Sequence, residues 1–162
     1  KDILKEEEQT LGSIDSTTQT IENFYSNINQ TIENFTTVIQ DHLEQGYSIW
    51  GYTAPAKATT WLSCLPSKVK KSIDFIIDDA LLKQNKYLPG TQIPIKSLKS
   101  IQTNENSFLS KFQVANFSQK SIGIIFSWNI LQSLLQNLKS NSVGSGKYLT
   151  PLPEVKILDT SN

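Results

Sequence analysis

The sequence predicts a three-layer, Rossmann-like α/β fold with a mostly parallel sheet and a long N-terminal helix. Short β-prone apolar segments alternate with segments of helical periodicity, the pattern of a sheet covered by helices on both faces. Residues 122–126 are apolar throughout, as in a strand buried on both faces of a parallel sheet. We therefore expect two parts, a connecting helix over residues 1–45 and an α/β domain over residues 46–162.

The long helix is predicted from apolar residues that recur at three- and four-residue spacing between Leu11 and Leu43. The sequence TIENF at residues 20–24 returns at residues 31–35, and this period keeps one face of a nearly straight helix apolar. That face can dock onto its own domain, onto another domain, or onto a second copy to form a homodimer. In each case we expect the apolar face to be covered, including Ile21, Ile28, Phe35 and Ile39.

A strand and a helix follow Gly46, a typical helix-ending residue. Residues 47–52 are aromatic and β-prone, which predicts the first strand. After a turn at residues 53–55, residues 56–65 have helix-forming character, and Pro66 ends that helix.

The next strand is predicted at residues 73–77. Residues 88–95 then contain a Pro-Gly turn followed by a short extended piece, in which Pro94 cannot donate a hydrogen bond to a central ladder. This stretch therefore suits a sheet edge or a loop that borders a site.

The C-terminal part of the chain continues the alternation. Residues 102–120 are compatible with a helix near 108–112 and a strand at 113–117, or with one long loop. The other predicted elements are a strand at 122–126, a helix at 130–138, a flexible loop at 140–146, and late strands at 148–149 and 155–158.

The charges argue against a nucleic-acid partner. Fifteen basic residues balance fifteen acidic ones, and the lysines are scattered instead of forming a basic stripe among aromatic residues. No electrostatic field for a polyanion is expected.

The rare residue types exclude several kinds of site. Cys64 is the only cysteine and His42 the only histidine, so an intrachain disulfide, a Cys-Cys metal pair and a histidine-rich zinc site are excluded. No apolar run approaches the roughly 20 residues that span a bilayer. The first eight residues are too charged for a signal peptide. We therefore expect a cytoplasmic protein without a membrane partner or a bound metal.

The candidate binding site lies beyond the carboxyl ends of the strands, where open parallel sheets bind ligands. At residues 51–57, backbone amides and the positive end of a helix can hold a phosphate to which Lys57 adds charge, unless Lys57 is simply solvated. Asp78 stands where such folds place a carboxylate for a ribose hydroxyl, although a plain strand-end acid fits equally. Trp128 is either a core residue or a lip of the site, and Asn129 follows it.

Five segments in a fixed order carry a resemblance to a known family. They resemble the C-terminal domain of SAM-dependent sugar C-methyltransferases over about residues 46–158. The segments are GYTAPAKATT at 51–60, DFIIDD at 74–79, KQNKYLPGTQIPI at 83–95, SWN at 127–129 and PLPEV at 151–155.

In that family a zinc-binding domain and a SAM-binding domain precede this one, and the nucleotide sugar lies between the SAM-binding and C-terminal domains. The resemblance implies that SAM binds on a separate domain and that this chain supplies no catalytic residue or cofactor site. It implies two partners, a nucleotide diphosphate sugar and a SAM-binding domain. Together, position and resemblance give these expected substrate-binding residues: Tyr52, Ala54, Lys57, Asp78, Pro89, Gly90, Thr91, Gln92, Trp128 and Asn129.

The chain also departs from the family. Thr53 stands where the family usually has a second glycine, and Gln92 where it commonly has a histidine. Gln132 and Ser133 stand where it has an acidic residue, and residues 102–120 resemble an insertion. These departures bear on which sugar is bound.

The leading hypothesis is a nucleotide-sugar-binding and domain-docking module that does not transfer methyl groups alone. The alternative from another class is a structural or interaction module that keeps the fold without the ligand, with the long helix as its contact surface. A third possibility is an independent binder of another nucleotide through Lys57 and Asp78.

Overall fold

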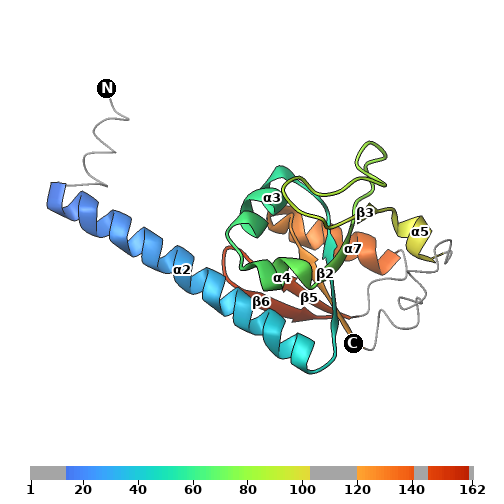
Figure 1. The fold of residues 1–162 in the computed structure, drawn as a ribbon, viewed down its shortest axis with the longest axis horizontal. Coiled ribbons are helices and arrows are strands. Elements are labelled where there is room, and N and C mark those ends of the chain that lie inside the picture. Colours follow the sequence, from blue (N-terminus) through green and yellow to red (C-terminus); the bar gives the residue numbers. More distant parts are fainter. Residues whose placement is uncertain (1–13, 103–119, 141–145, 161–162) are drawn as a thin grey trace.

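The computed structural model of the chain describes residues 14–102, 120–140 and 146–160. Its elements (Figure 1) are the helices α2 (Ile14–Glu44), α3 (Ala56–Ser63), α4 (Ser67–Lys71), α5 (Leu98–Gln102), α7 (Leu131–Ser140) and the short 3-10 helix η2 (Trp128–Ile130), and the strands β1 (Ser48–Tyr52), β2 (Ile73–Ile77), β3 (Ile95–Lys96), β4 (Ser121–Ile125), β5 (Lys147–Thr150) and β6 (Lys156–Asp159).

The strands form one six-stranded sheet in the order β3-β2-β1-β4-β5-β6. Neighbouring strands are parallel except for β6, which runs antiparallel to β5. This order confirms the predicted mostly parallel α/β fold. From β1 the chain adds β2 and β3 on one side of the sheet and then β4, β5 and β6 on the other. The crevice beyond the carboxyl ends of β1 and β4 is therefore the topological switch point at which such sheets bind ligands.

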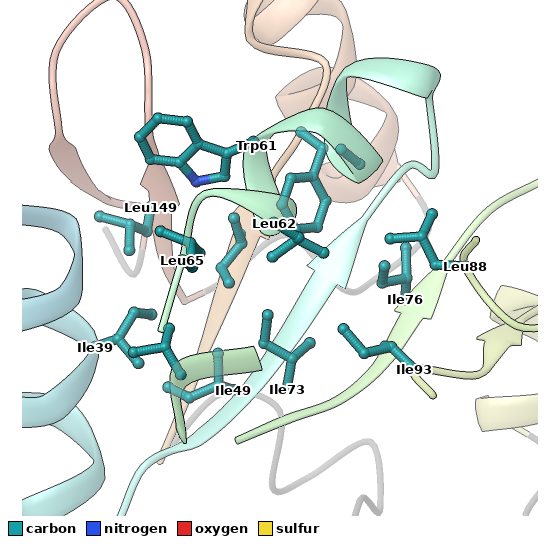
Figure 2. Packing of buried hydrophobic residues seen from close by; sticks show 14 of the residues in the cluster. Ile39, Ile49, Trp61, Leu62, Leu65, Ile73, Ile76, Leu88, Ile93 and Leu149 are labelled. Carbon is teal, nitrogen blue, oxygen red and sulfur yellow. The ribbon is translucent and has the colours of Figure 1, made fainter. Parts of the chain in front are cut away.

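Two apolar clusters cover the two faces of the sheet. One contains Phe35 and Ile39 from α2 together with Ala58, Trp61 and Leu62 from α3. Figure 2 shows several of these side chains packed over the isoleucines of β1 and β2. The other cluster packs α7 against the opposite face, through Leu134 and Leu138. The structure therefore has the three predicted layers, and each face of the central strands is buried.

Two glycines let aromatic side chains pack closely against the backbone of the sheet. A Cβ at Gly51 would lie 2.7 Å from the ring of Phe126, and a Cβ at Gly123 would lie 2.6 Å from the indole of Trp50. Because both aromatic side chains are fully buried, neither ring can move aside without disturbing its own neighbours. The glycine in the β4 run therefore has a packing role.

Helix α2 docks only along its C-terminal half. Phe35 and Ile39 are fully buried, whereas Ile21 is 49% exposed and Phe24 and Tyr25 are each 62% exposed. Figure 1 shows the N-terminal half of α2 projecting away from the α/β body. The α/β body therefore covers Phe35 and Ile39 and leaves Ile21 uncovered. Cover of Ile21 by another domain or by a second copy stays a prediction.

Most predicted elements are present, with small shifts in their ends. The strand at 73–77 is confirmed at both ends, and β3 is an edge strand as expected for the stretch after the Pro-Gly turn. The short helices α4 and α5 were not predicted. Residues 103–119 and 141–145 lie outside the described residues, and with them the alternatives for 102–120 and most of the expected loop at 140–146. Within the described ranges, no helix is long and apolar enough to cross a membrane.

Isoleucine-to-alanine substitutions in the docked and free halves of α2 should destabilise the chain to different extents. Ile39→Ala should lower the free energy of unfolding by about 2–5 kcal/mol, because it opens a cavity in the core. Ile21→Ala should change it by less than about 0.5 kcal/mol, because the side chain packs on nothing in the body. Urea unfolding of the two variants measures the difference. Equal losses would contradict the division of α2 into two halves.

Candidate functional site

The carboxyl ends of β1, β2 and β4 meet at one edge of the sheet. The amide of Thr53 donates to the carbonyl of Ile77 at 2.7 Å, and the amide of Phe126 donates to the carbonyl of Tyr52 at 3.2 Å. The turns that leave these three strands therefore start side by side. They carry Ala54 and Lys57, Asp78, and Trp128 and Asn129.

Asp78 joins the end of β2 to the turn between β1 and α3. Its Oδ2 accepts a 2.7 Å hydrogen bond from the amide of Ala54 and a 3.0 Å bond from Nζ of Lys83. Its Oδ1 accepts a 2.9 Å bond from the amide of Ala80. The buried Asp78 carboxylate thus binds the Ala54 amide, one of the amides at residues 51–57 that were predicted to bind a phosphate.

These donors keep Asp78 ionised. Burial alone would raise the pKa of its carboxyl group, but the hydrogen bonds from Ala54, Ala80 and Lys83 outweigh it and leave the pKa below the usual value. The group is therefore a fixed negative charge that shapes the turn. With its donors in place it is poorly suited to exchange protons near neutral pH.

Lys57 reaches across the switch point to the turn after β4. Its Nζ donates a 2.7 Å hydrogen bond to Oδ1 of Asn129 and lies 4.9 Å from the centre of the Trp128 ring. Both partners hold the ammonium group without neutralising it. Asp78 pairs with Lys83, and no carboxylate of the described residues pairs with Lys57.

A second link between the same two turns comes from Thr53. Its Oγ1 donates to Oγ of Ser127 at 2.9 Å. Thr53 has a φ of 66°, a left-handed conformation that a β-branched residue adopts only with strain. The hydrogen bond to Ser127 fixes this conformation, which turns the chain sharply from β1 into α3.

Tyr52 lies in the core instead of facing the crevice. It is 2% exposed, and its hydroxyl accepts a 3.2 Å hydrogen bond from Nδ2 of Asn137 on α7. Burial, reinforced by the charge of Asp79, raises the pKa of Tyr52 to about 12. Its ring therefore packs in the core between β1 and α7.

A hollow of about 240 Å³ lies beside the start of α3. Ala54, Pro55 and Thr59 line it on one side, and Tyr87 and Pro89 line it on the other. Pro89 is thus brought next to the turn that carries Ala54. The hollow lies on the β2–β3 side of that turn, whereas Lys57 reaches toward the β4 side.

Gly90, Thr91 and Gln92 are placed elsewhere. They line a second hollow, of about 730 Å³, together with Lys70, Lys71 and Ile73. Ile73 is the first residue of β2, so this hollow lies at the amino ends of the strands, opposite the crevice. The hydroxyl of Thr91 bonds within its own turn, to the carbonyl of Leu88 at 2.8 Å and from the amide of Ile93 at 3.1 Å.

The structure thus brings together Ala54, Lys57, Asp78, Trp128 and Asn129, with Pro89 nearby. Sequence reasoning did not include Thr53, Ser127, Lys83 or Tyr87 among the site residues. The spacing of Lys83 five residues after Asp78 was a usable signal, since a lysine there can turn back to a strand-end carboxylate. The described residues contain no cluster of three or more His, Cys, Asp or Glu that could hold a metal.

Comparison with known proteins identifies a family and a relative. Residues 1–153 match the family described as the C-methyltransferase C-terminal domain. The chain is also similar to the C-methyltransferase NovU of Streptomyces niveus, with 23% identity over 125 residues that make up 77% of this chain. The matched part is 26% of NovU, so the chain corresponds to about a quarter of that protein's length.

The Asp78 bonds predict a pH-dependent loss in Asp78→Asn. At pH 7 the variant should be less stable by about 1–3 kcal/mol, because the buried amide of Ala54 and the amide of Ala80 lose a charged acceptor. The lowered pKa means that this contribution is present above the ordinary carboxyl pKa of about 3.9 and is lost as pH falls through the lower value of the folded state.

Urea unfolding between pH 7 and about pH 3 measures this effect. The difference between wild type and Asp78→Asn should narrow on acidification. Asp79→Asn, an exposed neighbour with the same charge change, should differ little from wild type at either pH. A difference that stays constant with pH would argue against a special role for the Asp78 charge.

Proposed function

Because the chain belongs to the family of C-methyltransferase C-terminal domains, we propose that it is the nucleotide-sugar-binding and domain-docking part of a SAM-dependent sugar C-methyltransferase. In this proposal SAM and the catalytic base belong to other domains, and this chain alone transfers no methyl group. Its task is to hold the nucleotide end of the substrate.

The observation that carries the proposal is that Lys57, at the switch point, has no carboxylate partner among the residues that the structure describes. A lysine ammonium group has three donors, and Asn129 accepts from one of them. The remaining donors are available to a diphosphate lying between the start of α3 and the turn after β4. The positive end of α3 favours an anion in the same place.

Asp78 is compatible with an anion nearby. Its carboxylate faces the amides of Ala54 and Ala80 and the ammonium of Lys83, so much of its field is compensated locally. It also removes the Ala54 amide from the set of free donors. Lys57 therefore carries a larger share of phosphate binding than in a turn whose amides all point at the ligand.

The docking role rests on the free half of α2. Ile21, Phe24 and Tyr25 are exposed on a helix that leaves the body, and they form an apolar surface without a cover in the described chain. We place the SAM-binding domain against this surface. A cytoplasmic location fits the exposed free thiol of Cys64.

The alternative is a structural module that has lost the ligand. Its support is that the Ala54 amide and the Lys57 ammonium already have partners, Asp78 and Asn129, within the chain. In that case the crevice is a closed network whose polar groups need no ligand. Binding of a nucleoside diphosphate distinguishes the two functions.

Lys57→Ala should weaken the binding of a nucleoside diphosphate about tenfold, because a charge-assisted bond at an open cleft contributes about 1.4 kcal/mol. Isothermal titration of the chain with a thymidine diphosphate measures the dissociation constant. Lys57→Arg should retain most of the affinity. Lys139→Ala, which removes an exposed lysine at the end of α7, is the matched control and should bind like wild type.

Two outcomes would overturn the proposal. One is an absence of binding to the unmodified chain, which would favour the ligand-free module. The other is equal affinity in Lys57→Ala and Lys139→Ala, which would place the anion elsewhere.

A further inference from the structure

The hollow beside α3 has apolar side chains exposed along its rim. Leu82 is 84% exposed and Tyr87 is 66% exposed, and both line the hollow, while the adjacent Leu81 is 82% exposed. Single exposed apolar residues are common on protein surfaces, but several gathered at one concave site are typical of a binding surface.

The segment that carries these side chains is held in place by hydrogen bonds. Nε2 of Gln84 donates to the carbonyl of Asp78 at 3.0 Å, and the amide of Asn85 donates to the carbonyl of Ile95 at 2.9 Å. Tyr87 itself forms an antiparallel bridge with Pro94. The exposed ring of Tyr87 is therefore presented by a fixed backbone, and a ligand that stacks on it needs to order little of the chain.

The hollow also adjoins the proposed phosphate site. Ala54, Pro55 and Ala56 form its wall, and Lys57 follows them directly on α3. A ligand that lies over the start of α3 can thus place one end in the hollow and reach Lys57 with the other. On the hollow's own rim, Lys86 adds a positive charge.

The volume and the walls select the kind of group that fits. At about 240 Å³ the hollow is smaller than the roughly 300–1,000 Å³ of pockets that enclose a whole drug-sized ligand, so it suits one part of a larger ligand. Its lining includes Ala, Pro, Leu and Tyr side chains, which favour a flat ring held by stacking.

We infer that this hollow, between the start of α3 and residues 82–89, binds the nucleobase of the nucleoside diphosphate, with Tyr87 stacking on the base. The inference rests on the proposed function, which supplies the diphosphate at Lys57. Because stacking needs only a π-face, Tyr87 contributes affinity without reading the identity of the base.

The test compares two ligands, thymidine diphosphate and inorganic pyrophosphate, by isothermal titration. Tyr87→Ala should weaken thymidine diphosphate about tenfold and leave pyrophosphate unchanged, whereas Lys57→Ala should weaken both. Tyr87→Phe should bind like wild type because it keeps the aromatic face. Ile157→Ala is the control, since Ile157 is an exposed apolar residue on β6 that does not line the hollow.

The outcomes separate the inference from the proposed function. If Tyr87→Ala binds thymidine diphosphate as tightly as Ile157→Ala while Lys57→Ala remains weakened, the base lies elsewhere and the inference is overturned, although the proposed function stands. If Tyr87→Ala loses affinity for pyrophosphate as well, Tyr87 acts on the phosphate site and the inference is also overturned. If wild type binds neither ligand, both are overturned.

Discussion

The contacts of the Asp78 carboxylate organise the edge of the sheet on which the site is built. They join the end of β2 to the amide of Ala54 in the turn after β1, and to Lys83 in the segment that forms the wall of the hollow. Without this charge, a buried amide would lack its partner and the segment after β2 would lose one attachment. The shape of the crevice therefore depends on an acid that itself is poorly placed to react.

This arrangement changes how an anion can be held. In a phosphate-binding turn of the usual kind, successive amides at a helix start face the ligand. Here Asp78 takes one of these amides, and the strained Thr53 is fixed by Ser127. The positive charge available to a ligand is instead that of Lys57, held between Trp128 and Asn129. On the β2 side of the site, Asp78 is hydrogen-bonded within the chain. On the β4 side, the ammonium group of Lys57 has donors left for a ligand.

Much of the fold could be predicted from the sequence because strands that are buried on both faces are apolar along most of their length. The strand at 73–77 and the apolar run that became β4 are buried along most of their length, so their composition alone identifies them. Helix α4 was missed because it has only five residues, three of them lysines, and buries one side chain, Val69. The periodicity of α2 predicted an apolar face, but no local pattern shows how much of that face the body covers.

The site could be predicted in part for a similar reason. Asp78 directly follows β2, and Ala54, Lys57 and Asn129 lie in or just after the turns that leave β1 and β4, so knowing the strands places them at one edge. Gly90 and Gln92 precede β3 and so fall at the opposite edge, which the resemblance alone did not indicate. The partners of Asp78 and the exposure of Tyr87 depend on how the chain between β2 and β3 folds back, and that path leaves no periodic signal.

We propose that ligands bind at the switch point between β1 and β4, over the start of α3. Titration of the ¹⁵N-labelled chain with a nucleoside diphosphate, followed by amide chemical shifts, tests it most directly. Changes should be concentrated in residues 53–58 and 127–129, with further changes in residues 82–89. Changes concentrated instead around Lys70, Lys71 and Gln92, at the amino ends of the strands, would contradict the account.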